Sequence, residues 1–257
     1  MSTVPVVSTL RTSGLMRLAA VALLVVVWQA VVATVASESL PTPLEVAVEL
    51  WQRAASAEAW GHVVTTSWRV AVATAAATAV GVLLGIAMGV DRRAEAFLFP
   101  PVVVALGVPG PVYIIMAILI FGLGEVTTTL ALIASVVPFV INVVYEGVQS
   151  RDRRLDQMAR VYRYPTWSYL RHVLVAQSVP TLFSALRTSF GMSWKLVVLM
   201  EALSSSQGIG ARMVFHFRLL DPAAVVAYLA IFMVVMVVVD RLLFAPVERH
   251  LLRWRDG

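Results

Sequence analysis

Residues 222–244 read PAAVVAYLAIFMVVMVVVDRLLF, and the first eighteen of them carry no charge. A helix needs about 20 mainly apolar residues to cross the roughly 30 Å hydrocarbon core of a bilayer. This stretch therefore predicts a transmembrane helix. Five further stretches have the same character: 17–36, 66–90, 100–121, 126–148 and 178–202. We expect an all-α membrane protein with six transmembrane helices that form one permease-like membrane domain over residues 1–257.

The overall composition agrees with this prediction. Of the 257 residues, 60% are hydrophobic and 14% are charged, and the mean hydropathy is +0.85. Soluble globular chains carry about 45–50% apolar and about 25% charged residues. The hydrophobicity excludes a disordered chain, and the absence of cysteine excludes a disulfide scaffold and a Cys-ligated metal site.

The basic residues predict the orientation. The net charge is +5, but the arginines lie in short clusters between apolar stretches, which is typical of membrane topology and argues against nucleic acid as a partner. With the N-terminus inside, only three arginines fall in outer segments: Arg53, Arg212 and Arg218. The inner segments then hold Arg11, Arg17, Arg92, Arg93, Arg151, Arg153, Arg154, Arg160, Arg163, Arg171, Arg241, Arg249, Arg253 and Arg255. Both termini are predicted to be cytoplasmic, and residues 17–36 are read as a retained helix because the apolar stretch is long for a signal peptide.

Two spans carry packing signals. Gly81, Gly85 and Gly89 recur every four residues, so they share one helix face that a neighbouring backbone can approach closely. The third span is interrupted around Pro109. A break at membrane depth is tolerated only against protein or water, so it is either a kink that fits its neighbours or a break that lines a pathway.

The segment 149–177 is the longest polar stretch between the spans. Its apolar residues recur at helical spacing on either side of Pro165, which predicts two short amphipathic helices at an angle. Such a segment either binds another protein or rests on anionic lipid.

Here the sequence resembles a family. Residues in this segment are similar to the cytoplasmic EAA loop of permease subunits of bacterial ABC importers: Gln157, Met158, Ala159, Arg160, Arg163, Tyr164, Pro165 and Pro180. The resemblance implies that this loop forms a coupling helix that docks on an ATPase subunit. It departs from the usual pattern, because Gln157 replaces the leading Glu and Arg163 replaces a Gly that permits a tight turn. A heterodimer with a different permease subunit is one hypothesis for a degenerate loop, and a homodimer is the alternative.

Most of the chain is similar to the nitrate, sulfonate and taurine branch of these permeases. The matching pieces follow in order: Leu40-Pro41-Thr42-Pro43, His62, Ser67-Trp68-Arg69-Val70, Phe121-Gly122-Leu123-Gly124-Glu125, Pro138, Asn142, Leu186-Arg187, Gly191, Ser193-Trp194, Glu201, Gly208-Ile209-Gly210, Asp221 and Glu248-Arg249-His250-Leu251-Leu252-Arg253-Trp254. The resemblance implies a multi-pass protein of the bacterial cytoplasmic membrane with a type I importer permease fold. Implied partners are two ATPase subunits, a second permease subunit and an extracytoplasmic binding protein, with ATP and Mg bound by the ATPase subunits.

The chain itself shows no catalytic motif. It lacks the Gly-x-x-x-x-Gly-Lys-Ser/Thr phosphate loop, so another chain must supply the ATPase, and we expect no cofactor or metal in this chain. Charges inside a span mark function by default. By helical periodicity Arg187, Trp194 and Glu201 lie near one face of the fifth span, so they could line a common wall. The predicted residues of the translocation path are Pro109, Asn142, Arg187, Trp194 and Glu201. The alternative is that Arg187 and Glu201 lie near opposite membrane faces and pair with neighbouring helices.

The sequence predicts half of a translocation path for a small solute, such as a sulfonate, taurine or nitrate. Arg187 and Lys195 favour an anion, whereas Glu201 argues against one. A secondary transporter is the main alternative, although we find no internal repeat of the kind such transporters show. A membrane-embedded enzyme is a further alternative, but its catalytic groups would have to converge, and the candidates here are scattered.

Overall fold

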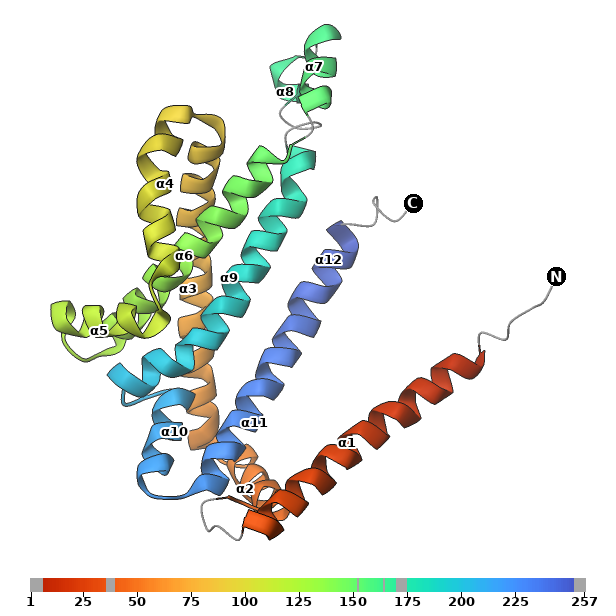
Figure 1. Ribbon diagram of the computed structural model, residues 1–257, viewed down its shortest axis with the longest axis vertical. Helices are drawn as coiled ribbons and strands as arrows, with labels where there is room; N and C mark the ends of the chain where they lie inside the picture. The colour runs from red at the N-terminus through yellow and green to blue at the C-terminus, as the bar shows by residue number, and fades with distance from the viewer. Residues whose placement is uncertain (1–6, 36–39, 152, 164, 170–174, 252–257) are drawn as a thin grey trace. The chain divides into compact units, whose positions relative to one another are not determined.

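The computed structural model describes residues 7–35, 40–151, 153–163, 165–169 and 175–251. Every regular element within these ranges is helical (Figure 1). The helices are α1 (Val7–Val35), α2 (Pro43–Ala54), α3 (Ala57–Val90), α4 (Arg92–Gly107), α5 (Gly110–Phe121), α6 (Glu125–Gln149), α7 (Arg153–Val161), α8 (Thr166–Tyr169), α9 (Val175–Ser204), α10 (Ile209–Arg218), α11 (Pro222–Val239), the π-helical turn η2 (Asp240–Phe244) and α12 (Ala245–Leu251).

The chain divides into two compact units. One comprises Met1–Ser56 with Met213–Ile231, and the other comprises Ala57–Arg212 with Phe232–Gly257. The second, larger unit contains the bundle of α3, α6 and α9, which lie side by side (Figure 1). We call these three helices the central bundle.

The contact between α3 and α6 depends on the three glycines. A Cβ at Gly81 would lie 2.4 Å from a methyl of Val140, and one at Gly89 would lie 2.4 Å from a methyl of Val148. A Cβ at Gly85, between them, would lie 2.8 Å from the carbonyl oxygen of Ile141. Since real Cβ atoms do not approach so closely, only glycine permits this packing. The predicted close-approach face on the second span is confirmed.

The predicted break in the third span is also confirmed. α4 ends at Gly107 and α5 begins at Gly110, and the two helices are bent by 102° relative to each other. Pro109 is the N-cap of α5 and no side chain caps this terminus. The helix before the break begins earlier than predicted, at Arg92, so Pro100 and Pro101 lie inside α4 and do not start it.

Among the described residues, three helices are long and apolar enough to cross a membrane: Ala57–Val90, Glu125–Gln149 and the segment Pro222–Arg249. The bent pair α4–α5 makes a fourth if it counts as one span. α1 contributes a shorter apolar stretch, Ala19–Val35. α9 has 30 residues but carries several polar side chains, of which Ser189, Ser193, Glu201 and Ser204 are buried in a helix that packs against α3 and α6.

In the smaller unit, α2 begins at a capping box. Thr42 Oγ1 accepts a hydrogen bond from the Glu45 amide, and the Glu45 carboxylate accepts one from the Thr42 amide. Pro43 follows at the first helical position, where its missing N–H costs nothing. This helix lies between the predicted spans 17–36 and 66–90, where no helix was predicted. Arg53, near the end of α2, pairs with Glu49 and lies 5.5 Å from the ring centre of Tyr228.

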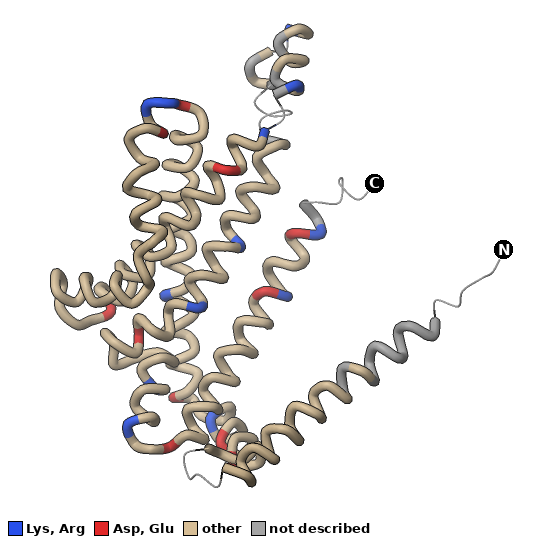
Figure 2. Tube along the Cα trace, in the orientation of Figure 1, with Lys and Arg blue, Asp and Glu red and all other residues tan. Residues whose placement is uncertain are grey.

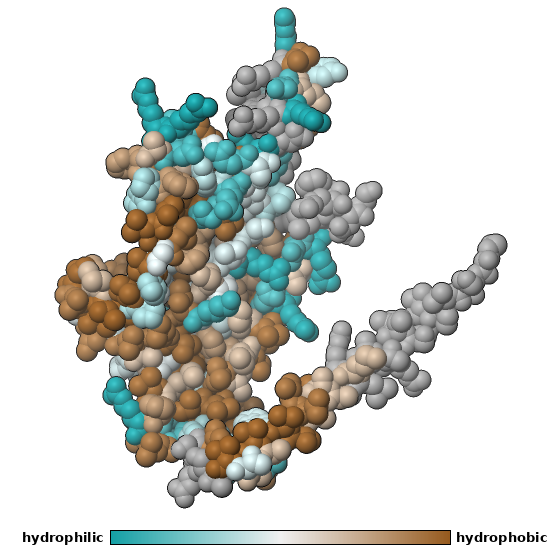
Figure 3. All heavy atoms as spheres, viewed as in Figure 1, coloured by the Kyte–Doolittle hydropathy of each residue, from teal (hydrophilic) through white to brown (hydrophobic). Residues whose placement is uncertain are grey.

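The two ends of the central bundle differ in polarity. The α3–α4 turn and α7 lie at one end, where hydrophilic residues gather, whereas hydrophobic residues cover much of α4, α5 and the middle of the bundle (Figures 1 and 3). At the opposite end, the amide of Gly124 before α6 donates to the carbonyl of Ser204, the last residue of α9. We call these the α7 end and the Ser204 end.

Candidate functional site

Among the side chains that the structure describes, the most buried charges meet at the Ser204 end. Arg69 of α3 is 3% exposed, Glu201 of α9 is fully buried, and Arg69 Nη1 donates to Glu201 Oε1 at 2.7 Å. A charge removed from water is expensive unless it is paired and its remaining hydrogen-bonding capacity is filled. The polar groups around this pair meet that requirement.

Both oxygens of the Glu201 carboxylate have further donors. The Thr66 hydroxyl lies 2.9 Å and 3.0 Å from the two oxygens, and the Gly210 amide donates to Oε2 at 2.9 Å. Thr66 accepts in turn from the amide of Ile209 at 2.9 Å. Amides at the start of α10 therefore donate to the carboxylate and to its threonine partner. The N-terminus of a helix is a favourable place for negative charge.

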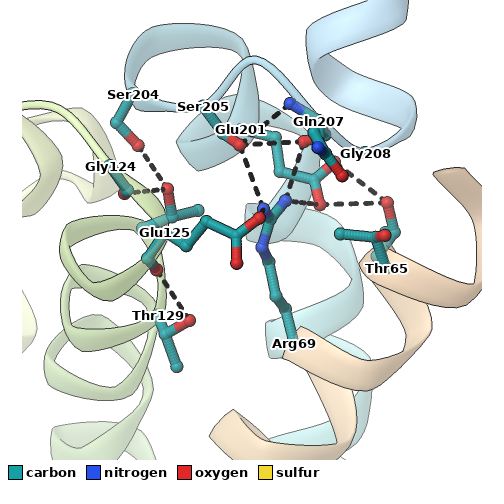
Figure 4. A network of polar contacts seen from close by, with 12 residues as sticks. Thr65, Arg69, Gly124, Glu125, Thr129, Glu201, Ser204, Ser205, Gln207 and Gly208 are labelled. Atoms are coloured by element: carbon teal, nitrogen blue, oxygen red, sulfur yellow. Dashed lines mark hydrogen bonds and ion pairs between the residues drawn. The ribbon is translucent and has the colours of Figure 1, made fainter.

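Arg69 uses its other donors to hold two further segments. Nη1 also donates to the carbonyl of Gln207 at 2.8 Å, and Nη2 donates to Ser205 Oγ and to Glu125 Oε1, each at 3.0 Å. Figure 4 shows the Arg69 side chain reaching from α3 into the turn that follows α9, with Glu125 of α6 on its other side. One guanidinium thus connects the three bundle helices and the α9–α10 turn. We call Arg69, Glu201, Thr66, Glu125 and residues 205–210 the Arg69–Glu201 network.

Two glycines make the turn fit onto the carboxylate. Gly208 has φ +104°, a conformation that side chains rarely adopt, and a Cβ there would lie 2.3 Å from the Glu201 carboxylate. A Cβ at Gly210 would lie 2.2 Å from the carbonyl oxygen of Val198. The Gly208 amide donates to His62 Nδ1 at 3.1 Å. The turn is therefore fixed by close backbone approach on one side and by hydrogen bonds on the other.

The network is suited to holding helices together and contains no catalytic arrangement. The buried carboxylate is matched by a buried guanidinium, and its oxygens are occupied by donors from the protein. Glu58 lies near His62 and pairs with Arg212, but no group of three His, Cys, Asp or Glu residues that could hold a metal occurs in the part of the chain that the structure describes.

The three predicted path residues on α9 have different environments. Glu201 belongs to the Arg69–Glu201 network. Trp194 is 1% exposed and stacks on Phe232 with ring centres 4.9 Å apart. Arg187 is 38% exposed and faces α11–α12. Arg187 and Glu201 are thus paired with neighbouring helices, as the alternative interpretation expected, and their assignment to a translocation path stays a prediction.

Arg187 bonds two carboxylates because of the π-helical turn. It lies 3.2 Å from Asp240 and also pairs with Glu248. In a regular α-helix, residues eight apart are rotated by about 80°, and the wider π turn reduces that rotation. Asp240, Phe244 and Glu248 therefore share the face toward α9, where Phe244 packs 4.8 Å from the ring of Phe190.

The remaining predicted path residues lie apart from one another. Asn142 of α6 is half-buried and donates to Glu146 one turn later, at 2.8 Å. Pro109 is exposed at the α4–α5 break. Their role also stays a prediction.

The predicted coupling loop forms a short helix, a turn and a second short helix beyond the ends of α6 and α9 (Figure 1). In α7, Ala159 is 3% exposed, whereas Gln157 and Met158 are exposed. Pro165 precedes α8, and Pro180 lies inside α9. Tyr164 and residues 170–174 lie outside the described residues, as does the side chain of Arg160.

The turn after α7 forms without glycine. Arg163 has φ +48°, the left-handed conformation that helices commonly use at their C-terminal end and that glycine adopts most easily. A side chain in this conformation costs about 1–2 kcal/mol. The turn is therefore kept without glycine, with strain at Arg163, and the way in which this loop docks on an ATPase subunit stays a prediction.

Sequence reasoning missed most of the Arg69–Glu201 network. Glu201 was selected as an intramembrane charge, but Arg69 and Glu125 appeared only as parts of matching pieces. They lie 132 and 76 residues before Glu201, and a single sequence does not reveal such pairs. The available signal was charge balance, because a buried glutamate requires a cation at the same depth.

Comparison with known proteins gives the family. Residues 77–249 match the model of the binding-protein-dependent transport system inner membrane component family. A protein of Bacillus subtilis (strain 168) named as an aliphatic sulfonates transport permease, SsuC, is 27% identical over 92% of this chain and 86% of its own length. SsuC of Escherichia coli (strain K12) is 32% identical over 73% of this chain and 72% of its own length. The taurine transport system permease protein TauC of Escherichia coli (strain K12) is 24% identical, covering 84% of this chain and 80% of TauC.

The family consists of non-catalytic components of ABC transporters, and several apolar helices fit a multi-pass protein of the bacterial inner membrane. The chain belongs to the binding-protein-dependent transport system inner membrane component family, as an ABC importer permease of the sulfonate, nitrate and taurine branch.

Proposed function

We propose that this chain is the transmembrane subunit of an ATP-driven importer and forms half of the translocation path for a small solute of the sulfonate, taurine or nitrate kind. A second permease subunit, identical or different, supplies the other half. An extracytoplasmic binding protein delivers the solute, and two ATPase subunits bind ATP and Mg. The names of the relatives support the solute class.

In this proposal the chain crosses the membrane six times with both termini in the cytoplasm. The α7 end is the cytoplasmic end. Its support is that Arg92 and Arg93 of the α3–α4 turn lie at the same end of the central bundle as the arginines of α7 (Figures 1 and 2). Since basic residues are retained on the cytoplasmic side, this common location agrees with the positive-inside distribution.

The observation that carries the proposal is the surface of α7, its turn and α8. Tyr162 and Trp167 are 73% and 72% exposed, and Val161 is 78% exposed. These large apolar side chains lie within the longest polar segment of the chain, where exposure to water is unfavourable and a protein partner would cover them. The segment resembles the ATPase-coupling loop of the family, so we assign its exposed face to the ATPase subunit.

Co-purification from the native host tests this assignment. The tagged chain is isolated in mild detergent, and associated proteins are identified by mass spectrometry for wild type, Tyr162→Ala, Trp167→Ala and a control, Phe97→Ala. Phe97 is 79% exposed near the start of α4, outside the coupling segment. We expect an ATPase subunit with wild type and the control, and at least tenfold less with Trp167→Ala. Absence of an ATPase from all samples would instead favour a secondary transporter.

The same contact with the ATPase subunits would drive a conformational change of the membrane helices. Closure of the ATPase pair on ATP would shift α7 and α8, and the connected helices α6 and α9 would carry that shift across the membrane. The Arg69–Glu201 network holds the other ends of α3, α6 and α9 together, so they move as a unit. Such a unit meets the requirement for a two-state element whose equilibrium a nucleotide biases.

A further inference from the structure

Lys195 of α9 is the only lysine in the sequence. α9 contains three charged side chains, Arg187, Lys195 and Glu201. Arg187 is matched by Asp240 and Glu248, and Glu201 is matched by Arg69. Lys195 is exposed, and among the described residues it has no hydrogen bond or ion pair. Within the described part of the chain, it is therefore the charge on this helix that has no partner of opposite charge.

Lys195 lies on the surface of the central bundle, well away from both of its ends. It stands nine residues before Ser204 and fourteen residues after Thr181, the residue that Gly147 of α6 approaches near the α7 end. These separations correspond to about 13 Å and about 21 Å along a helix. The Cα–Cβ bond of a helical residue tilts toward the helix N-terminus. The Lys195 side chain therefore points first toward the α7 end, which is the more distant of the two. This direction makes it harder for the ammonium group to reach water at the Ser204 end.

The helix face around Lys195 is polar and open. Ser184 is exposed, Thr188 is partly exposed, and a Cβ at Gly191 would meet nothing within 4 Å. Ser184, Thr188, Gly191 and Lys195 follow one another at four, three and four residues, so they share one face of α9. We call this the Lys195 face. A lysine and hydroxyls facing hydrocarbon are costly, and such residues normally face a protein partner or water.

The α4–α5 break lies beside the same level of α9. A Cβ at Gly110, the first residue of α5, would be 2.9 Å from Leu196 Cδ2. Leu196 directly follows Lys195. Non-helical backbone at membrane depth is tolerated where protein or a water-filled cavity receives its polar groups. Two independent features, the unbalanced lysine and the interrupted backbone, thus occur at one depth.

We propose that the Lys195 face lines the aqueous solute path and that Lys195 makes this path favour anions, so that the transported solute carries a negative charge at physiological pH. This inference rests on the proposed importer function and adds the residue that meets the solute. It also removes the conflict between Glu201 and an anionic solute. Glu201 is neutralised by Arg69 and has no exposed surface, so its charge does not act on the path.

Cysteine reactivity tests the proposal directly, because the natural chain contains no cysteine. Gly191→Cys and, as an independent reporter, Thr188→Cys are made in the native complex and reconstituted in nanodiscs. Each is treated with an anionic methanethiosulfonate, the ethylsulfonate reagent, and with a cationic one, the ethyltrimethylammonium reagent. Modification of this chain is followed by mass spectrometry. Two controls are Val197→Cys, buried on the same helix, and Leu83→Cys, exposed on α3 within an apolar segment.

We expect both reporters to react and both controls to remain unmodified. Residues four apart on a helix have Cβ atoms about 5–6 Å from each other. At that separation a unit charge changes the local concentration of an ion severalfold even in water. Lys195→Gln should therefore lower the anion-to-cation rate ratio at Gly191→Cys by about threefold or more, whereas Lys195→Arg should keep it.

Two results would overturn the inference. If neither reporter reacts in a correctly assembled complex, the face is covered by lipid or by the second permease subunit. If the reporters react but the rate ratio does not change in Lys195→Gln, Lys195 does not set the charge preference. ATPase content and ATP hydrolysis are measured on the same preparations. Loss of these from wild type contradicts the importer function, while an intact ATP-hydrolysing complex with an unchanged ratio contradicts the inference alone.

Discussion

Arg69 Nη1 and Glu201 Oε1 lie 2.7 Å apart in a position where neither side chain has more than 3% of its surface exposed. The pair joins α3 to α9, and its surrounding donors and acceptors come from α6 and the α9–α10 turn. Nearly all of the hydrogen-bonding capacity of both groups is used inside the protein. The connection between the bundle helices at the Ser204 end therefore depends on these two charges remaining together.

Removing one partner should be far more damaging than removing both. Arg69→Leu leaves the Glu201 carboxylate buried without its cation, for which we expect a loss of about 3–5 kcal/mol. The double variant Arg69→Leu with Glu201→Leu should lose less than the sum of the two single variants, because no uncompensated charge remains. Unfolding of the detergent-solubilised protein by denaturant measures both. A loss in the double variant equal to the sum of the two single losses would contradict a coupled pair.

Gly208→Ala should destabilise the α9–α10 turn by more than the unfavourable φ angle of alanine alone. The φ of +104° is unfavourable for alanine by about 1–3 kcal/mol, and the new Cβ would meet the Glu201 carboxylate. Gly122→Ala is the matched control, because Gly122 has φ +76° with nothing within 4 Å. Thermal unfolding followed by intrinsic fluorescence should give a lower midpoint for Gly208→Ala. Equal unfolding midpoints for Gly208→Ala and Gly122→Ala would show that the turn does not pack closely against Glu201.

The α3–α6 contact can be tested with two glycines in helix interiors. Gly85→Ala introduces a Cβ 2.7 Å from Val144 Cβ and 2.8 Å from a backbone oxygen, so we expect about 1–3 kcal/mol of destabilisation. Gly191→Ala places a Cβ in open space, where alanine gains up to about 1 kcal/mol from helix propensity. The two variants should therefore shift the unfolding midpoint in opposite directions. An unchanged or raised midpoint in Gly85→Ala would contradict the close approach of α3 and α6.

The turn after α7 is strained at Arg163, so glycine at this position should stabilise it. Arg163→Gly removes the Cβ that disfavours φ +48°, whereas Arg163→Val adds a branched side chain to the same conformation. Hydrogen exchange of the α7 amides should become slower in Arg163→Gly and faster in Arg163→Val, by several-fold in each direction. Unchanged exchange in both variants would mean that Arg163 does not hold this turn.

The sequence predicted those features that have a local cause. The glycine repeat at 81, 85 and 89 and the break near Pro109 follow from spacing and backbone chemistry within a few residues. α2 was missed although Thr42 and Glu45 form a capping box, because the segment was read only as a loop between spans. Number of spans and orientation remain predictions, since length and composition alone identify three or four candidate spans in the described residues.

The candidate site was predictable only in part, for physical reasons. An isolated intramembrane charge signals importance, and this found Arg187 and Glu201. It does not reveal the partner that neutralises the charge, and that partner decides whether the charge acts on a solute or on a neighbouring helix. Helix periodicity grouped Arg187, Trp194 and Glu201 on one face, yet the exposed face of α9 is the one that carries Lys195. Packing against α3 and α6 determined which face is buried.

The central claim is that ATP hydrolysis by a partner drives a solute through this chain. The most direct measurement is uptake by proteoliposomes that contain the complex purified from its native host, with ATP enclosed and the native binding protein and radiolabelled ethanesulfonate or nitrate outside. We predict uptake that requires ATP and the binding protein, persists when ionophores collapse the ion gradients, and is lost with Trp167→Ala. Uptake that continues without ATP and stops with ionophores would contradict the account and identify a secondary transporter.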